Sequence, residues 1–162
     1  MRKNTDLSSE MKTPIPTSEN YSIFRDYIDQ RHTAGGMTDM TALDFAAMVE
    51  DTFVNTRLFE YRLKRDNPLE HSNPGEGELV ATALSDIMED GLSMIYSFFN
   101  PAYNDRSLGT YMVLDHIERA RKMGLPFLYL GYWVPGSSKM DYKSRFLPQE
   151  RLDATGWHRS QV

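Results

Sequence analysis

The sequence predicts an α/β (α+β) fold in which helices flank a mixed central sheet. Residues 57–64 alternate apolar and charged side chains, which is typical of a half-buried strand near a sheet edge. A helical pattern separates the strand-like run 92–99 from the buried apolar run 127–133, so these segments form a β-α-β unit with a parallel strand pair and a right-handed crossover. Apolar residues recur at helical spacing in three segments, roughly 19–33, 40–50 and 106–123.

Each expected helix has residues that favour its start or its end. We expect the last of the three helices to bury a stripe of four apolar residues and to turn its charged residues and His116 toward water. The stripe consists of Val113, Leu114, Ile117 and Ala120. The helix starts are expected after Ser18, after Thr38-Asp39 and at Asn104 or Asp105, and the ends at Gly35-Gly36 and at Gly124 with Pro126.

Strand and loop signals fill the rest of the chain. A strand over 79–88 pairs with the run that follows it through a tight turn at Asp90-Gly91. Proline and glycine make 66–78 a loop, and a last strand is expected near 145–152. The polar segment 1–17 is expected to be a linker or extended arm.

Composition excludes several classes of protein. The chain has 162 residues and no cysteine, which excludes a disulfide scaffold, a cysteine-ligated metal and a thiol nucleophile. No apolar run is long enough to cross a membrane and no secretory signal begins the chain, so we expect a cytoplasmic protein with no membrane partner. The net charge is −5, but residues 119–151 carry seven basic and two acidic residues. Such a block holds a polyanion, or it forms an ordinary solvated surface.

The first candidate site is the segment 106–111, RSLGTY, between a strand and a helix. Backbone N–H groups at a helix start favour anions, Arg106 adds a positive charge, and Gly109 leaves room for a ligand. The segment resembles the loop with which Gcn5-related N-acetyltransferases hold the pyrophosphate of acetyl-CoA. Tyr111 replaces a small residue of that loop and is expected to crowd the pyrophosphate. The alternative is that Gly109 only allows close packing.

The second candidate site is the segment 130–146, in which aromatic residues alternate with cations. Rings stack on bases and cations hold phosphates or a carboxylate. Each tyrosine at the end of the apolar run is equally compatible with a core position. The candidate binding residues are Lys139, Tyr142, Lys143 and Arg145.

Residues 93–152 resemble the C-terminal domain of the aminoacyl-tRNA–protein transferases, which comprise arginyltransferases and bacterial aspartate/glutamate leucyltransferases. The resemblance extends over roughly 20–158. It rests on YSFF at 96–99, RSLGTY at 106–111, LPFLYLGYW at 125–133, KMDYKSRFLP at 139–148, and Glu150.

The resemblance implies an acetyltransferase-like fold over 18–162 that transfers an aminoacyl group, leucyl or arginyl, from aminoacyl-tRNA to proteins with acidic N-termini. It implies no cofactor and no DNA partner, and the extended N-terminus marks the acceptor for degradation. The family's preceding Cys-containing domain is not in this chain, and Ser137-Ser138 stands where many relatives have Cys-Arg. Tyr129 and Tyr132 are the expected catalytic hydroxyls. A CoA-dependent N-acetyltransferase and a noncatalytic module that binds acidic N-termini or RNA are the alternatives.

Overall fold

The computed structural model describes residues 4–31, 39–64, 77–137 and 140–160. They belong to two compact units, residues 1–129 and 130–162, which are described in turn. Among the described residues, no helix is long and apolar enough to span a membrane.

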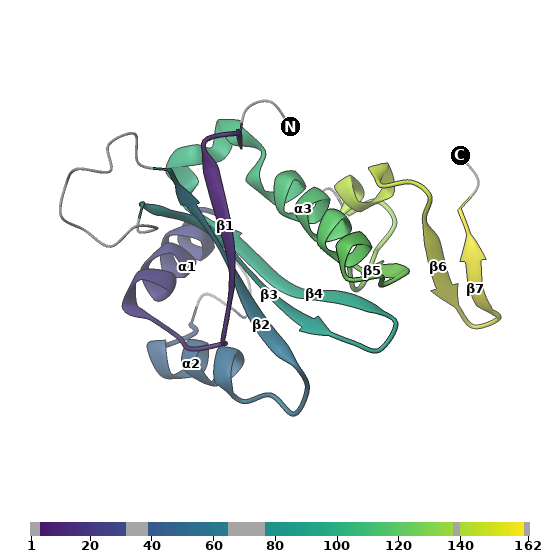
Figure 1. The fold of residues 1–162 in the computed structure, drawn as a ribbon, viewed down its shortest axis with the longest axis horizontal. Coiled ribbons are helices and arrows are strands. Elements are labelled where there is room, and N and C mark those ends of the chain that lie inside the picture. Colours follow the sequence, from purple (N-terminus) through teal and green to yellow (C-terminus); the bar gives the residue numbers. More distant parts are fainter. Residues whose placement is uncertain (1–3, 32–38, 65–76, 138–139, 161–162) are drawn as a thin grey trace. The chain divides into compact units, whose positions relative to one another are not determined.

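The first unit contains a five-stranded mixed sheet in the order β1-β2-β3-β4-β5 (Figure 1). The first four strands pair antiparallel, and β4 and β5 pair parallel. The antiparallel β3–β4 hairpin and the parallel β4–β5 pair are those that the sequence predicted. The strands are β1 (Leu7–Lys12), β2 (Thr56–Leu63), β3 (Leu79–Ile87), β4 (Gly91–Phe99) and β5 (Phe127–Tyr129).

Helices lie on both faces of this sheet (Figure 1). The helices α1 (Ser18–Arg31) and α2 (Ala42–Glu50) bury their apolar side chains with Leu58, Leu84 and Phe98 on one face. On the other face, α3 (Leu108–Lys122) packs against Phe59 and Tyr61. Adjacent residues of β2 therefore belong to different cores, because successive side chains of a strand point to opposite faces.

Both faces of β2 are buried, which corrects the prediction of a half-buried edge strand. Glu60 is only 4% exposed, although the alternating pattern placed it toward water. Burial alone would raise the pKa of Glu60, but hydrogen bonds from Lys12, Asn20 and Arg62 lower it below its usual value. A carboxylate surrounded by these donors is stable inside the fold because its charge is paired and hydrogen-bonded.

Residues 7–12 form an edge strand, whereas the sequence predicted a linker or arm over 1–17. Leu7 pairs with Leu63 and Lys12 pairs with Leu58. Leu7 is the buried side chain of β1, so the segment LSSEMK lacks the alternation that signals a strand. Backbone pairing with β2 and the Lys12–Glu60 ion pair (2.8 Å) hold it in place instead.

The apolar run 127–133 pairs with the sheet only over β5, and Phe127 is 44% exposed. The prediction of a buried strand up to Trp133 is therefore wrong. Gly131 has a φ of +69°, which lies outside the extended region of the backbone. The right-handed crossover between β4 and β5 remains a prediction.

The helix α3 buries Val113 and Ala120 of the expected stripe but not Leu114 and Ile117. The buried residues are Leu108, Met112, Val113, His116 and Ala120, and Ile117 is 41% exposed. His116 was expected on the exposed face of the helix because histidine is a polar residue. In the structure its ring is fully buried.

A short 3₁₀ helix, η2 (Pro101–Arg106), precedes α3 where the sequence predicted the start of the long helix. The Asn100 side chain accepts a hydrogen bond from the backbone N–H of Ala102 (3.0 Å) and so caps η2. Neither Asn104 nor Asp105 is the N-cap of α3, because Ser107 holds that position.

The second unit contains a 3₁₀ helix and an antiparallel hairpin. These are η3 (Asp141–Arg145), β6 (Glu150–Asp153) and β7 (Gly156–Arg159). The strand predicted near 145–152 corresponds to β6 in its second half, and β7 was not predicted. Most of the predicted loop 66–78 lies outside the described residues. The histidines His32 and His71 also lie outside them.

Candidate functional site

An irregular strand edge marks the candidate site in the first unit. The pairing of β4 with β5 stops at Ser93–Tyr129, although β4 continues to Phe99. On its other side β4 pairs Leu84 with Tyr96 and Ser85 with Met94, so Ile95 is an extra residue in a β-bulge. In the described part of residues 1–129, no strand pairs with this edge of β4 beyond Ser93. Bulges of this kind are common beside active sites, because they redirect neighbouring groups.

The first turn of α3 follows β4 through η2. Ser107 takes the left-handed conformation at the N-cap (φ 53°, ψ 42°), and its side chain forms no capping hydrogen bond. The first backbone N–H groups of a helix have no partner within the helix, and the helix dipole makes this end positive. This arrangement suits an anion, as the segment 106–111 predicted.

Gly109 is not required for close packing. A Cβ atom at this position would lie 3.9 Å from Cε1 of Phe99, which is an ordinary van der Waals contact. The packing alternative for this glycine is therefore wrong. The absence of a side chain at Gly109 leaves more space beside the first turn of α3.

Arg106 is engaged within the protein rather than directed to an open site. Its guanidinium forms an ion pair with Asp6, and its Nε donates to Asn4 Oδ1 (2.9 Å). The Asn4 side chain donates in turn to the Arg106 carbonyl (3.1 Å). The hydrogen bond from Arg106 lowers the pKa of Asp6. Arg106 thus ties the segment before β1 to the loop that begins α3, and it acts here as a positioning residue.

Tyr111 faces the core and does not protrude from the first turn of α3. Its ring lies 5.8 Å from that of Tyr61, centroid to centroid, and packs against the buried cluster of this face. Burial raises the pKa of Tyr111. The expectation that Tyr111 crowds a phosphate path is not supported by this orientation.

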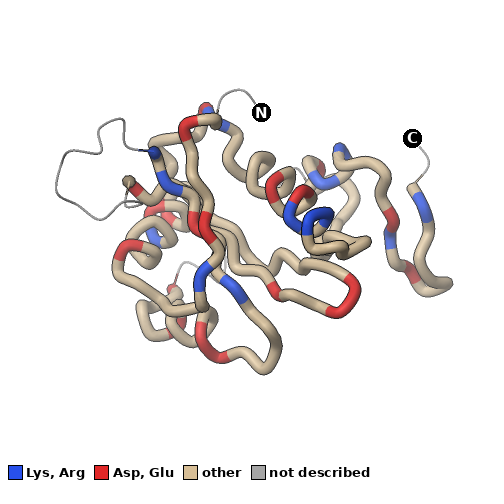
Figure 2. Tube along the Cα trace, viewed as in Figure 1, with Lys and Arg blue, Asp and Glu red and all other residues tan. Residues whose placement is uncertain are grey.

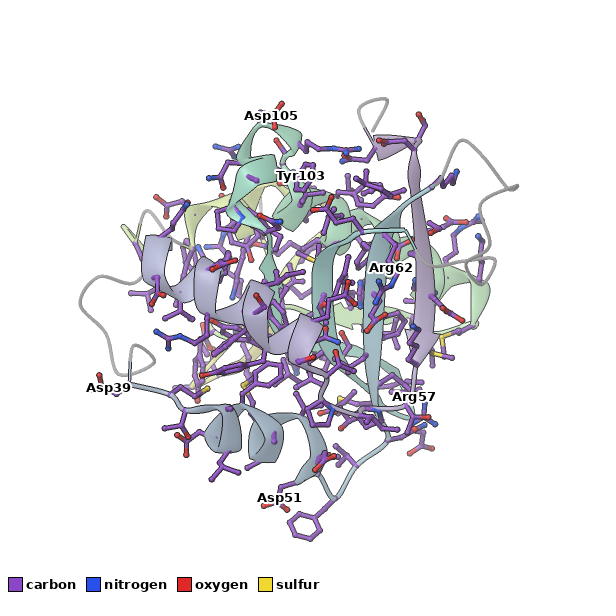
Figure 3. The ribbon with its side chains drawn as sticks, turned by 90° about the vertical axis from the view of Figure 1, so that its left-hand side faces the viewer. Asp39, Asp51, Arg57, Arg62, Tyr103 and Asp105 are labelled. Atoms are coloured by element: carbon purple, nitrogen blue, oxygen red, sulfur yellow. The ribbon has the colours of Figure 1, made fainter. Side chains whose placement is uncertain are left out.

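A hollow of about 250 Å³ lies where α1 meets the end of β4 and η2. Figure 3 views the face with α1 and α2 and labels Tyr103 and Asp105, which flank Asn104 on η2. The lining residues are Tyr27, Gln30, Phe99, Pro101 and Asn104. They come from three separate elements, so no local sequence pattern marks the hollow.

The hydroxyl proton of Tyr129, an expected catalytic residue, is used in a hydrogen bond within the protein. Tyr129 donates to Asp90 Oδ2 (2.8 Å) in the turn between β3 and β4. A phenol that donates its only hydrogen still has lone pairs to accept one. Gly91 lies under the same ring, because a Cβ there would come within 2.9 Å of Tyr129 Cε2.

In the second unit, Lys143 fastens the residues that follow β5. Its Nζ donates to the carbonyl of Leu130 (2.7 Å) and to that of Tyr132 (2.6 Å). Burial lowers the pKa of Lys143. Two of its three donors are therefore used within the unit, whereas the sequence offered it as a free cation for a carboxylate or phosphate.

Other candidate residues of the second unit differ in exposure. Arg145 is exposed and forms no ion pair within the described residues, and Tyr132 is 89% exposed. Tyr142 is half-buried, with its ring 6.3 Å from that of Phe146. Lys139 lies outside the described residues.

Cations in the two units have different surroundings. Basic residues cluster at the C-terminal end of α3, where Figure 2 shows them in blue (Arg119, Arg121 and Lys122). Arg121 and Lys122 pair with Glu118 one turn away, and Arg119 pairs with Asp115. Arg151 stacks on the Trp133 ring, 3.6 Å from its centroid. Most of the described basic residues of 119–151 are thus used in local pairing, hydrogen bonding or stacking, whereas Arg145 forms no ion pair with another described residue.

A buried polar network that the sequence did not reveal connects α3 to the sheet. His116 Nδ1 donates to the carbonyl of Met112 (2.8 Å), and Nε2 accepts from Ser85 Oγ (3.0 Å). Tyr61 donates to Asp115 Oδ2 (2.8 Å). Burial lowers the pKa of His116 to about 4. Both His116 and Ser85 are fully buried, so this pair holds the fold together and has no access to substrate.

No group of three or more potential metal ligands occurs among the residues that the structure describes.

Solved structures with the same fold are acetyltransferases. The ribosomal-protein-S18-alanine N-acetyltransferase from Escherichia coli matches with a TM-score of 0.51 and 14% identity, over 85% of this chain and 76% of that chain. The PaiA N-acetyltransferase from Thermoplasma acidophilum, solved in complex with coenzyme A, matches with a TM-score of 0.51 and 10% identity, over 93% and 96%. At such low identity these matches establish the fold alone, which is the Gcn5-related N-acetyltransferase fold that the sequence predicted.

Curated relatives are far closer in sequence. Aspartate/glutamate leucyltransferase from Bradyrhizobium sp. (strain ORS 278) is 61% identical over the whole chain, and that from Afipia carboxidovorans is 62% identical over 98% of it. The chain spans 62% and 61% of the length of these two relatives. A family model described as "Arginine-tRNA-protein transferase, C terminus" matches residues 19–153. The chain therefore belongs to the family of arginine-tRNA-protein transferase C-terminal domains.

Proposed function

We propose that this chain acts in the transfer of a leucyl group from aminoacyl-tRNA to the α-amino group of proteins that begin with Asp or Glu. The relatives named aspartate/glutamate leucyltransferase favour leucyl over arginyl. The product carries an extended N-terminus that marks it for degradation by the N-degron route in the cytoplasm. The observation that supports this best is the edge of β4 beyond Ser93, with its bulge at Ile95, close in sequence to the anion-favouring start of α3.

The chemistry is aminolysis of an ester. The amine nitrogen attacks the ester carbonyl carbon, the new C–N bond replaces the C–O bond to the ribose, and a proton passes from the amine to the ribose oxygen. An α-amino group has a pKa near 7.7–8.0, so a useful fraction is neutral at physiological pH. Positioning the two substrates is then the main task of the protein.

Each part of the first unit has a proposed role in this reaction. The first turn of α3 binds the phosphate of the donor's terminal nucleotide, and Gly109 keeps that turn accessible. Unpaired backbone N–H groups on the edge of β4 stabilise the negative charge on the carbonyl oxygen. The hydroxyl oxygen of Tyr129 accepts a hydrogen bond from the attacking amine, because its proton is already donated to Asp90.

The second unit supplies contacts to RNA and to the acidic acceptor. Exposed Arg145 is the proposed phosphate or carboxylate ligand, with Lys139 and Tyr142 beside it in sequence. Lys143 shapes the backbone at Leu130 and Tyr132 and adds a partly buried charge. Tyr132, the other predicted catalytic tyrosine, is 89% exposed, so its hydroxyl is accessible to a substrate bound by this unit.

A direct test is mass spectrometry of an Asp-initiated peptide incubated with this chain and Leu-tRNA or Arg-tRNA. We expect the mass of one leucyl residue to be added from Leu-tRNA, with an Asn-initiated peptide as the matched control acceptor. Addition from Arg-tRNA alone would refute the assignment of leucine. Failure of the chain with both donors, with or without the remaining part of a full-length relative added in trans, would refute the transfer function.

The salt dependence of tRNA binding separates a phosphate contact from a contact to the acceptor. For Arg145→Gln, loss of one phosphate contact should reduce the slope of log K against log salt by about 0.7–0.9. An unchanged slope together with weaker use of the Asp-initiated peptide would assign Arg145 to the acceptor's carboxylate instead.

A CoA-dependent N-acetyltransferase is the second candidate, and the inward orientation of Tyr111 favours it more than the sequence did. Thermal stabilisation by acetyl-CoA, compared with stabilisation by Leu-tRNA, distinguishes the two donors. Binding of tRNA or of acidic N-termini without transfer in the peptide assay would identify the third possibility, a noncatalytic module.

A further inference from the structure

We propose that the hollow between α1, the end of β4 and η2 binds an adenine base, and that this base is the terminal adenosine of the tRNA donor. The identification of the adenosine's source rests on the proposed function, whereas the adenine site itself is argued from the lining residues. Nothing in the names of the relatives assigns this hollow a ligand.

The walls of the hollow offer aromatic surface and two carboxamides. The rings of Tyr27 and Phe99 meet at 66° with centroids 5.1 Å apart. Phe99 is only 8% exposed, so a flat base would stack on the half-buried Tyr27 ring and touch the accessible edge of Phe99. Gln30 and Asn104 complete the lining, together with Pro101. Base–aromatic stacking contributes about 1–3 kcal/mol per base.

The carboxamides favour adenine over other bases and over an apolar side chain. An Asn or Gln side chain pairs with the amino group and the adjacent ring nitrogen of adenine, because it offers one acceptor and one donor side by side. Neither Gln30 nor Asn104 forms a side-chain hydrogen bond within the part of the chain that the structure describes, and both residues are exposed. A leucyl side chain placed here would make no hydrogen bond with either amide, so these residues would contribute nothing to its recognition.

The charge of the hollow also fits a neutral base. None of its five lining residues is ionisable near neutral pH, so the hollow has no carboxylate for an arginyl group and no cation for an acidic side chain. Its volume of about 250 Å³ falls below the usual range of sites for drug-sized ligands, which agrees with a ligand of one base.

The hollow adjoins the start of α3 through Phe99. The ring of Phe99 lines the hollow, and its Cε1 lies 3.9 Å from the position of a Cβ at Gly109. We therefore expect a nucleotide with its base in the hollow to direct its phosphate toward the first turn of α3. α1 and η2 are in contact, so the two carboxamides come from neighbouring elements.

Calorimetric titration of the whole chain with AMP, CMP and inorganic phosphate tests the adenine site. We expect AMP to bind at least tenfold more tightly than CMP. The double variant Gln30→Leu, Asn104→Leu should bind AMP at least tenfold more weakly and leave phosphate binding unchanged. Asn55→Leu is the matched control, because Asn55 is exposed and does not line the hollow. Far-UV circular dichroism of each variant verifies the fold.

Several outcomes would overturn the proposal. AMP that does not bind, AMP and CMP that bind equally, or a double variant that keeps the AMP affinity of the parent chain would each remove the adenine site. An RNA minihelix ending in CCA, compared with the same RNA ending in CCC, and coenzyme A as a competitor of AMP identify the source. Competition by coenzyme A without preference for CCA would overturn the tRNA assignment.

The outcomes also separate this proposal from the proposed function. Transfer of leucine in the peptide assay without adenine selectivity would refute only the hollow as the base site. Adenine selectivity that depends on Gln30 and Asn104, without transfer from either aminoacyl-tRNA, would support the site and refute the function.

Discussion

Acidification should destabilise this protein through one buried histidine. His116 is fully buried, and its two ring nitrogens are occupied by the Met112 carbonyl and by Ser85 Oγ. Ser85 donates to Nε2, so a proton on that nitrogen would force the Ser85 hydroxyl to turn and accept instead, and it would place a charge in the core. The folded state therefore binds this proton only near pH 4, whereas an unfolded chain binds it near pH 6.5.

The sign and the size of the effect follow from this difference. The unfolded state binds more protons between pH 6.5 and 4, so the free energy of unfolding falls as the pH is lowered through this range. The slope approaches 1.36 kcal/mol per pH unit, and the loss at pH 4.5 relative to pH 7 is about 2.5 kcal/mol from His116 alone. That is a large part of the stability of a small domain.

Urea unfolding followed by circular dichroism at pH 7.0, 6.0, 5.0 and 4.5 measures the loss. Carboxylates also titrate at the low end of this range, so His116→Gln serves as the reference and the difference between the two profiles isolates the histidine. NMR of the imidazole resonances gives the pKa and the tautomer directly. A pKa of His116 near 6.5, or equal losses of stability in the two proteins, would refute the reasoning.

Three further substitutions test other features. Gly109→Ala should leave the unfolding free energy unchanged or raise it by up to about 1 kcal/mol, because the Cβ fits and alanine favours a helix. The same substitution should weaken the binding of phosphate and AMP. Equal binding by the variant and the parent chain in calorimetry would contradict an open helix start. Glu60→Gln should lower the unfolding free energy by about 2 kcal/mol, since Lys12 and Arg62 lose a buried partner. The surface control Glu118→Gln should change it far less in the same urea titration. Tyr129→Phe should reduce the single-turnover rate of leucyl transfer at least tenfold. It should lower the unfolding free energy by no more than about 1.5 kcal/mol, since it removes one hydrogen bond. An unchanged rate would remove Tyr129 from the mechanism.

The parts of the fold predicted correctly are those where one physical signal dominates. The helical period of α1 and α2 and the Asp90-Gly91 turn between β3 and β4 were identified because local preference and tertiary packing agree there. The strand β1 was missed because its backbone pairing, and not an apolar face, places it in the sheet. His116 and Glu60 were assigned to water because their side chains are polar, and only the partners that surround them in space make burial favourable.

The candidate site was predictable only where its residues are contiguous in sequence. The helix that starts within the motif 106–111 was predictable from the local sequence, and the binding roles proposed for its residues stay predictions. Engagement of Arg106 by Asp6 was not predictable, because these residues are 100 positions apart and neither shows a pattern. The hollow was invisible for the same reason, since the chain brings Gln30 and Asn104 together only after folding.

The link from Asn4 and Asp6 to Arg106 makes the beginning of this chain relevant to a distant loop. Removal of both Asn4 and Asp6 would release the guanidinium and loosen η2 just before the first turn of α3. Preparations that differ only in their first few residues should then differ in nucleotide affinity while keeping similar cores. Comparisons of activity between such preparations need matched amino termini.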